Sequence, residues 1–190
     1  MTDRLSDTDK AILLKIAREA IISAVNGKLP DQIDLKKFSK ELQADGASFV
    51  TVTNKGKLRG CIGALEAYQP LAMDVQEHAV AAALEDYRFN PVSADEIALI
   101  KIEISWLTPL NKLDYSDNKD LIGKLHPGVD GVLIKDGSGR ATFLPQVWGQ
   151  ISNCEEFLSH LCMKMGAQSN LWQQKHLDVF IYQVEEFKED

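Results

Sequence analysis

One stretch of the chain, residues 49–63, decides the fold and reads FVTVTNKGKLRGCIG. Its first five residues are mostly β-branched, and Asn54-Lys55-Gly56 is typical of a tight turn, so the stretch predicts a β-hairpin. Side chains alternate between the two faces of a strand. On the returning strand, this alternation places Arg59, Cys61 and Gly63 on one face. The residues expected on the opposite face are Leu58, Gly60 and Ile62.

The pattern Arg59-x-Cys61 on this strand indicates a reactive thiol. On a shared face the two residues would lie about 6–7 Å apart, and a nearby positive charge favours the thiolate, which is the nucleophilic form of cysteine. Glycines such as Gly60 and Gly63 mark places where a ligand or another backbone comes close to a strand. The alternative is structural, because cysteine often acts as a small buried hydrophobe and the glycines would admit an alanine-rich helix.

Several segments resemble the AMMECR domain family, beginning with its signature at residues 56–63, GKLRGCIG. The likeness continues, in the family's order, at Asp86-Tyr87-Arg88-Phe89 with Pro91, at Ile102-Glu103-Ile104-Ser105, at Pro127–Val132 and at Thr142–Trp148. The resemblance implies a single AMMECR-type domain over residues 1–190. It also implies an antiparallel sheet with flanking helices, in a larger and a smaller lobe around a cleft, with the signature near the cleft.

The resemblance implies no established activity. The chain resembles the bacterial type, the A component of the so-called AmmeMemoRadiSam system, in which the domain is associated with a Memo-like protein and a radical S-adenosylmethionine enzyme. Two functions follow as hypotheses. In the first, Cys61 is the nucleophile or thiol acceptor of an enzyme component, and Arg59 favours its thiolate or binds a small anionic ligand. In the second, the domain is a non-catalytic protein-interaction module. No cofactor is predicted.

Composition limits the classes of partner and the compartment. A net charge of −7 without a basic stripe argues against nucleic acid. The polar N-terminal segment lacks an apolar signal core, and no apolar run approaches the roughly 20 residues of a membrane span. The three cysteines Cys61, Cys154 and Cys162 are irregularly spaced and form no disulfide framework. The sequence therefore predicts a cytoplasmic protein with reduced thiols.

Helix and strand signals alternate along the chain, which predicts the α+β class. Residues 108–130 are the least regular part, rich in Asp, Asn, Gly and Pro, and any lobe boundary is expected there. One predicted helix follows a cap at Ser6–Asp9, a second spans about Asp34–Leu42, and a third begins at Pro70 and runs to about Glu85. A short helix begins at the capping-box pattern of Ser93 and Glu96. Another follows Ser152, with the apolar stripe Phe157, Leu158, Leu161 and Met165. The predicted strands beyond the first hairpin are Ile100–Leu107, the two arms of a second hairpin over 132–143, and Val179–Phe187. In the first of these, Ile100, Ile102, Ile104 and Trp106 are expected on one face, and Lys101, Glu103 and Ser105 on the other.

Three further residues are predicted to belong to the site. His126 precedes a Pro-Gly pair and is a candidate base for Cys61, with a solvated loop histidine as the alternative. Glu103 lies on the polar face of its strand and would pair with Arg59, either as a clamp that orients a ligand-binding arginine or as a surface ion pair. Asp130 is either a site carboxylate or a turn former.

The remaining polar motifs favour structural roles. Asp86 and Arg88 are predicted to form a self-contained pair at the corner after the third helix. None of the four histidines pairs with a cysteine, or with another histidine, at the spacing of metal ligands, and Cys154 and Cys162 lie about 12 Å apart along one helix. No metal site is predicted.

Overall fold

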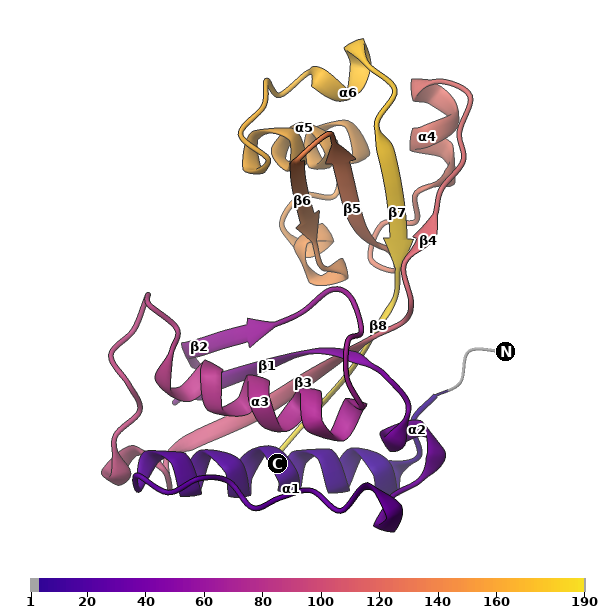
Figure 1. Cartoon of the computed structure of the whole chain (residues 1–190). Coiled ribbons are helices and arrows are strands. Elements are labelled where there is room, and N and C mark those ends of the chain that lie inside the picture. The colour runs from indigo at the N-terminus through magenta and orange to yellow at the C-terminus, as the bar shows by residue number, and fades with distance from the viewer. Residues whose placement is uncertain (1–3, 190) are drawn as a thin grey trace. The chain divides into compact units, whose positions relative to one another are not determined.

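The computed structural model describes residues 4–189 of the chain. These residues form two compact units, one built from the chain up to Leu107 together with residues from Glu185 onward, the other from Thr108–Val184. Each unit combines helices with one four-stranded sheet (Figure 1). The pairs β1–β2, β1–β3, β4–β7, β5–β6 and β5–β7 are antiparallel. The predicted α+β class is therefore confirmed.

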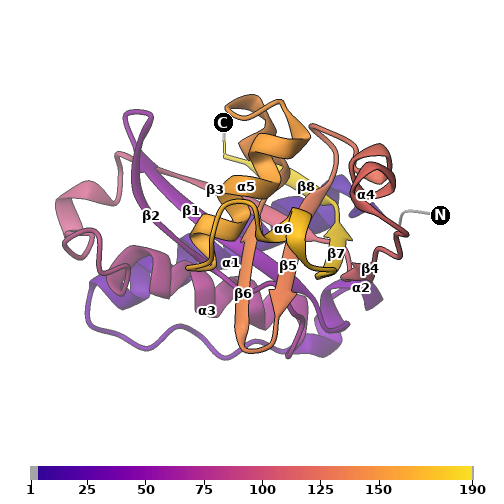
Figure 2. The ribbon, with the colours of Figure 1, turned by 90° about the horizontal axis from the view of Figure 1, so that it is seen from above.

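A sheet of order β2-β1-β3-β8 forms the centre of the first unit. Its strands are β1 (Ala47–Asn54), β2 (Lys57–Gly63), β3 (Ile100–Leu107) and β8 (Val184–Lys188). The β1–β2 hairpin is confirmed, and Figure 2 shows it from a second side. Its turn requires positive φ at Lys55 (51°) and Gly56 (75°), a pair of values typical of two-residue hairpin turns.

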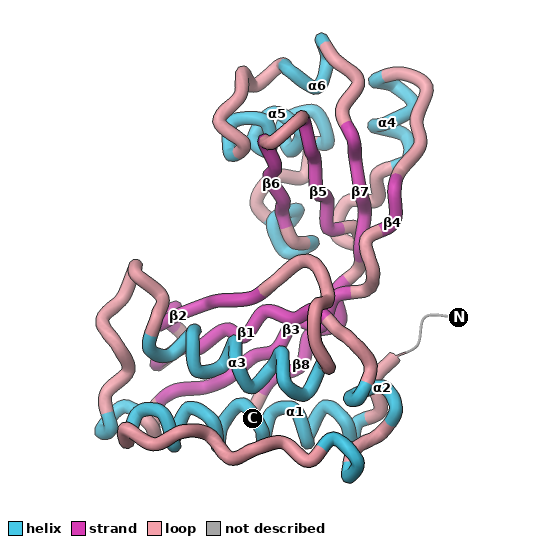
Figure 3. Tube along the Cα trace, in the orientation of Figure 1, coloured by secondary structure: helices cyan, strands magenta, loops and turns pink. Residues whose placement is uncertain are grey.

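Helices α1 (Asp7–Val25) and α3 (Leu71–Leu84) run along one face of this sheet (Figure 3). Ser6 caps α1 by accepting the backbone N–H of Asp9 at 3.1 Å. The single helix expected over residues 34–42 is wrong, because the chain there forms two short pieces. They are the 3₁₀ turn η1 (Leu35–Lys37) and helix α2 (Lys40–Gln43), which begins anew where the Ser39 hydroxyl accepts the N–H of Leu42.

The core of the first unit lies between these helices and the sheet. Val50 and Val52 of β1 are buried there with every second residue of the first part of β3, which confirms the predicted alternation as far as Ile104. The buried residues of that part are Ile100, Ile102 and Ile104. Thr51 and Glu103, which alternate with them, are half-buried on the opposite face of the sheet. Beyond Ile104, Ser105 is buried and Trp106 is half-buried. A short 3₁₀ turn, η2 (Ala94–Glu96), precedes β3 and carries the predicted capping box of Ser93 and Glu96.

The second unit has a sheet of order β4-β7-β5-β6. Its strands are β4 (Asn111–Lys112), β5 (Gly131–Asp136), β6 (Gly139–Phe143) and β7 (Asp178–Tyr182). Its helices are α4 (Asn118–Lys124), the 3₁₀ turn η3 (Pro145–Gly149), α5 (Cys154–Lys164) and α6 (Leu171–Gln174). Phe157, Leu158 and Leu161 of α5 are fully buried, as their spacing predicts.

The final strand predicted over Val179–Phe187 is wrong, because that segment forms two strands in different sheets. β7 belongs to the second unit and β8 to the first, with Gln183 between them. The backbone of Gln183 is held by Thr108, whose N–H and hydroxyl bond to its C=O and N–H at 2.9 and 2.8 Å. Within residues 4–189, no helix is both long enough and apolar enough to cross a bilayer.

Candidate functional site

Cys61 lies in β2, directly opposite Thr51 of β1. The two side chains point away from the face covered by α1 and α3, since the neighbouring Val50 and Val52 fill that face. The Thr51 hydroxyl donates a hydrogen bond to Cys61 Sγ at 3.2 Å. Cys61 is a free, half-buried thiol. The local structure therefore holds the sulfur in one position without sealing it from solvent.

The backbone of Cys61 is held by an ion pair from the loop after α3. Asp86 accepts the Cys61 N–H at 2.9 Å, and Arg88 donates to the Cys61 C=O at 3.2 Å. Two further hydrogen bonds, of 2.8 and 2.6 Å, join the guanidinium to the carboxylate. The predicted Asp86–Arg88 pair is confirmed. Because it bonds to both the N–H and the C=O of Cys61, we call the pair the clamp.

The charges of this clamp are set by its geometry. Arg88, with help from the Cys61 N–H, holds the pKa of the buried Asp86 carboxyl well below its usual range. The pKa of Arg88 is raised, chiefly by its hydrogen bonds with Asp86. The Arg88 side chain is 45% exposed. Its Nη1 has no hydrogen-bond partner among residues 4–189, so the clamp offers unused donors beside the cysteine.

Arg59 does not lie over Cys61, and the predicted face pattern is wrong at this point. Leu58 pairs with Thr53 and Gly60 with Val52, so Arg59 is an extra residue that bulges from the strand. One inserted residue reverses the alternation, and Leu58 falls on the face of Cys61. The guanidinium of Arg59 turns to Glu96 instead.

The pairing of Arg59 with Glu103 is also wrong. Arg59 makes two hydrogen bonds of 2.8 Å to the Glu96 carboxylate and donates to the carbonyls of Asn90 and Pro91 at 2.6 and 3.2 Å. Four of its five N–H groups are thus engaged. Arg59, together with the capping box, lowers the pKa of Glu96 to about 2. Arg59 thus connects β2 to η2 and to the segment that precedes η2.

Two of the three glycines of the signature, Gly60 and Gly63, face close neighbours. A Cβ on Gly60 would overlap the carbonyl oxygen of Ala82, so the backbone of α3 lies directly against β2. A Cβ on Gly63 would overlap the Ser48 carbonyl oxygen and the Phe49 ring. Close helix packing, the structural alternative, accounts for Gly60. A ligand-binding role for either glycine stays a prediction.

The other predicted site residues are divided between the units. Glu103 lies opposite Thr51, so Cys61, Thr51 and Glu103 form one cross-strand row in the first unit. His126 and Asp130 belong to the second unit, where the buried Asp130 carboxylate accepts from the backbone N–H of His126 and contacts its Nδ1 at 2.9 and 3.0 Å. Asp130 thus closes the turn around Pro127. The role of His126 as a base for Cys61 stays a prediction.

The sequence analysis did not include Thr51 in the site, and it expected Arg59 next to Cys61, where the structure places Arg88. The hairpin register places Thr51 directly opposite Cys61, and side chains of directly opposed residues contact each other. This register was the signal in the sequence that could have identified Thr51. Arg88 was assigned to structure alone. Burial raises the pKa values of the other two thiols, Cys154 and Cys162. Among the described residues, no group of three or more His, Cys, Asp or Glu side chains is placed to hold a metal ion.

The two antiparallel sheets with their helices and the signature on β2 agree with the AMMECR-type domain that the sequence resembles. The family model for AMMECR1 matches residues 14–187, and the chain belongs to this family. A protein of Methanothermobacter thermautotrophicus is 37% identical over 98% of this chain and 97% of its own length. Protein MJ0810 of Methanocaldococcus jannaschii is 36% identical over 93% of this chain and 88% of its own length.

A solved structure has the same fold. The crystal structure of the uncharacterized protein PH0010 from Pyrococcus horikoshii matches with a TM-score of 0.87 and 28% identity. The match covers 98% of this chain and 94% of that one. None of these relatives bears a name that states an activity.

Proposed function

We propose that the chain is a thiol-dependent enzyme component in which Cys61 reacts with a small anionic molecule, or with an anionic group on a partner protein. The observation that carries the proposal is the fixed position of a free, solvent-accessible thiol. Its backbone is gripped by Asp86 and Arg88, and its sulfur accepts from Thr51. A purely structural cysteine needs no such set of polar contacts, because its packing alone would hold it.

Arg88 takes the role that the sequence assigned to Arg59. Its guanidinium is exposed and keeps Nη1 available, whereas Arg59 is occupied by Glu96 and two carbonyls. A planar guanidinium suits a carboxylate or a phosphate. An anionic substrate bound to Arg88 would therefore be held beside the sulfur of Cys61.

The proposed reaction is a nucleophilic substitution. The thiol proton passes to water, and the sulfur of Cys61 forms a bond to the electrophilic atom of the substrate. The leaving group departs with the electron pair of the bond that breaks. This step needs no cofactor in the chain itself. In the bacterial AmmeMemoRadiSam setting that the sequence resembles, the Memo-like protein or the radical S-adenosylmethionine enzyme would supply the substrate or receive the product.

Iodoacetamide labelling at pH 7 tests the proposal. We expect Cys61 to be alkylated faster than Cys154 and Cys162, because burial raises the pKa values of the latter two thiols. Replacing Arg88 by glutamine should slow labelling of Cys61 several-fold, since the nearby positive charge is lost. The matched variant Arg59→Gln should leave the rate unchanged. Mass spectrometry of tryptic peptides over a time course gives all three rates.

Two results would contradict the thiol proposal. Equal labelling rates at the three cysteines would make Cys61 an ordinary half-buried residue. If Arg59→Gln slowed the alkylation of Cys61 and Arg88→Gln did not, Arg59 and not Arg88 would be the residue whose charge activates the thiol.

A protein-interaction module is the second candidate, and Tyr87 favours it. Its side chain is 94% exposed, although it stands between the two residues of the clamp. Tyrosine on a rigid backbone is a frequent anchor of protein interfaces. In this alternative the clamp holds Tyr87 for a partner, and the thiol has no chemical role.

Calorimetric titration with the purified Memo-like protein of the same organism separates the two candidates. If the chain is a module, Tyr87→Ala should weaken binding by at least about tenfold, as for an interface anchor, and Cys61→Ser should leave it unchanged. If Tyr87→Ala left the affinity unchanged, the hypothesis of an interaction module anchored by Tyr87 would be wrong.

A further inference from the structure

A second polar cluster lies in the first unit, built from residues that the Cys61 site does not use. Asp74 of α3 is completely buried, and its Oδ2 accepts the Ser48 hydroxyl at 2.6 Å and contacts Nδ1 of His78 at 3.2 Å. Nε2 of His78 lies 3.4 Å from the hydroxyl oxygen of Tyr68. His78 is nearly buried, while Tyr68 is 54% exposed. The cluster therefore runs from a buried carboxylate, through an imidazole, to a phenol at the surface.

The order of these groups fixes the direction of the hydrogen bonds. Because the carboxylate of Asp74 only accepts, Nδ1 of His78 carries the proton in a neutral ring. Nε2 then accepts, and the Tyr68 O–H donates to it. The phenol oxygen then keeps its lone pairs, and it lies close to the side chains of Gln69 and Glu77, which both affect its pKa. Asp74 Oδ2 is shared by the Ser48 hydroxyl and His78, while Asp74 Oδ1 has no hydrogen-bond partner within the described chain.

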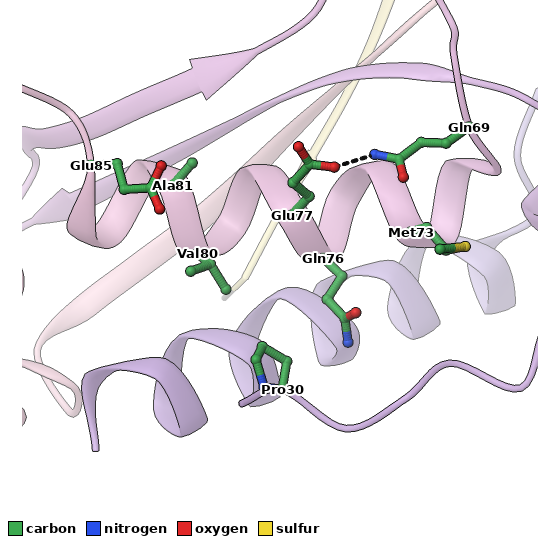
Figure 4. A pocket seen from close by; sticks show the side chains of 8 residues that line it. All are labelled: Pro30, Gln69, Met73, Gln76, Glu77, Val80, Ala81 and Glu85. Atoms are coloured by element: carbon green, nitrogen blue, oxygen red, sulfur yellow. Dashed lines mark hydrogen bonds between the residues drawn. The ribbon is translucent and has the colours of Figure 1, made fainter. Parts of the chain in front are cut away.

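Tyr68 precedes Gln69 in the chain and lies close to the side chains of Gln69 and Glu77. These two residues help to line a groove along α3 (Figure 4). The groove has a volume of about 370 Å³, within the range of small-molecule sites. Met73, Val80, Ala81 and Pro30 supply its apolar lining; its polar residues are Gln69, Gln76, Glu77 and Glu85, and no Lys or Arg lines it.

The groove next to Tyr68 presents acceptors. Gln69 donates its amide to Glu77 at 2.6 Å, which leaves the amide oxygen of Gln69 as an acceptor. The pKa of Tyr68 is raised by partial burial and then by the negative charges of Glu77 and Asp74, so the phenol lies within their influence. Carboxylate, amide oxygen and phenol oxygen thus gather near an apolar channel that has no positive charge.

We propose that this groove binds a protonated primary amine with an alkyl chain. The ammonium would donate to Glu77, Gln69 and the oxygen of Tyr68, and the chain would lie over Met73, Val80 and Ala81. His78 and Asp74 are positioning residues, because they keep the proton of Tyr68 turned away from the ligand. The site is separate from Cys61 and its chemistry is independent of the proposed function.

Nuclear magnetic resonance titration of the whole protein tests the site, with hexylammonium as the probe and hexanoate as the matched anion. We expect hexylammonium to shift the α3 amides around residues 73–81 in a saturable way, and hexanoate not to do so. Glu77→Gln and Tyr68→Phe should each weaken binding by about fivefold or more, as expected for the loss of a hydrogen bond to a charged group. Glu41→Gln, an exposed carboxylate on another helix, is the control and should change nothing. Both test residues are exposed, so these variants are expected to fold.

A second measurement reads the positioning residues directly. The ring nitrogens of His78 should report the Nδ1–H tautomer, and Tyr68→Phe should shift the Nε2 signal. A lysine side chain carries the same ammonium, so Nα-acetyl-lysine N-methylamide is titrated in parallel. Binding of both probes supports a shared ammonium site, and binding of hexylammonium alone supports a free amine. Equal binding of hexylammonium and hexanoate, or binding that neither variant weakens, would overturn the proposal.

Discussion

Replacing Gly60 by alanine is expected to lower the free energy of unfolding of the first unit by about 3 kcal/mol, the upper part of the usual range for overpacking. The added Cβ would overlap the carbonyl oxygen of Ala82, which belongs to the backbone of α3. A backbone atom cannot move aside by changing a rotamer, so the helix must shift away from β2. Amide hydrogen exchange of the β1 and β3 core, which reports on the first unit, measures the loss.

Gly123→Ala is the matched control for this prediction. Gly123 lies in α4, and a Cβ there would meet nothing within 4 Å. Alanine in a helix is better than glycine by roughly 1 kcal/mol at most, so this variant should be as stable as the parent or slightly more so. Exchange rates in Gly60→Ala equal to those of the parent would show that α3 does not rest on the strand.

The Arg59–Glu96 pair is expected to make the stability of the first unit depend on acid. The pKa of Glu96 is lowered to about 2 from an ordinary value of 4.5. Its contribution to stability is therefore complete above pH 4.5 and is lost as the pH falls toward 2. At pH 7, Glu96→Gln and Arg59→Gln should each lower the free energy of unfolding by about 1–3 kcal/mol, the range expected for a partly screened shift of this size.

Measuring the free energy of unfolding of the parent and of both variants over a series of pH values tests the direction of this effect. The difference between the parent and either variant should shrink steadily between pH 5 and pH 2, because the parent loses its charged pair as Glu96 is protonated. Glu41→Gln should show neither the loss nor the pH dependence. A difference that stays constant over this range would mean that the carboxylate makes no special contact in the folded protein.

The local sequence pattern was enough to predict those elements whose determining residues are close together in the chain. The hairpin, the buried alternation of β3 and the Asp86–Arg88 pair all depend on residues close together in the sequence. The helix α4 was missed because its Asp, Asn and Gly residues were interpreted as loop. Asp117 in fact caps it by accepting two backbone N–H groups. The division of the final strand between β7 and β8 depends on Thr108, 75 residues away from Gln183.

The sequence was enough to predict Cys61 as the centre of the candidate site, but not the side chains that contact it. The glycines and alternation singled out Cys61, but alternation cannot reveal an inserted residue, so the bulge at Arg59 was invisible. The partner of Arg59 is Glu96, 37 positions along the chain, and nothing in the local pattern favours it over Glu103. Arg88 acts on Cys61 through a loop whose path depends on how α3 ends.

The clamp on Cys61 has a consequence for the solubility of the protein. β2 is the outermost strand of its sheet, and such a strand normally offers free N–H and C=O groups to a strand of another molecule. At Cys61 the carboxylate of Asp86 and the guanidinium of Arg88 already take both groups, as a neighbouring strand would. Two charged side chains thus protect the edge strand β2 from pairing with a strand of another molecule. They do so without burying the side chain of Cys61, which remains half-buried.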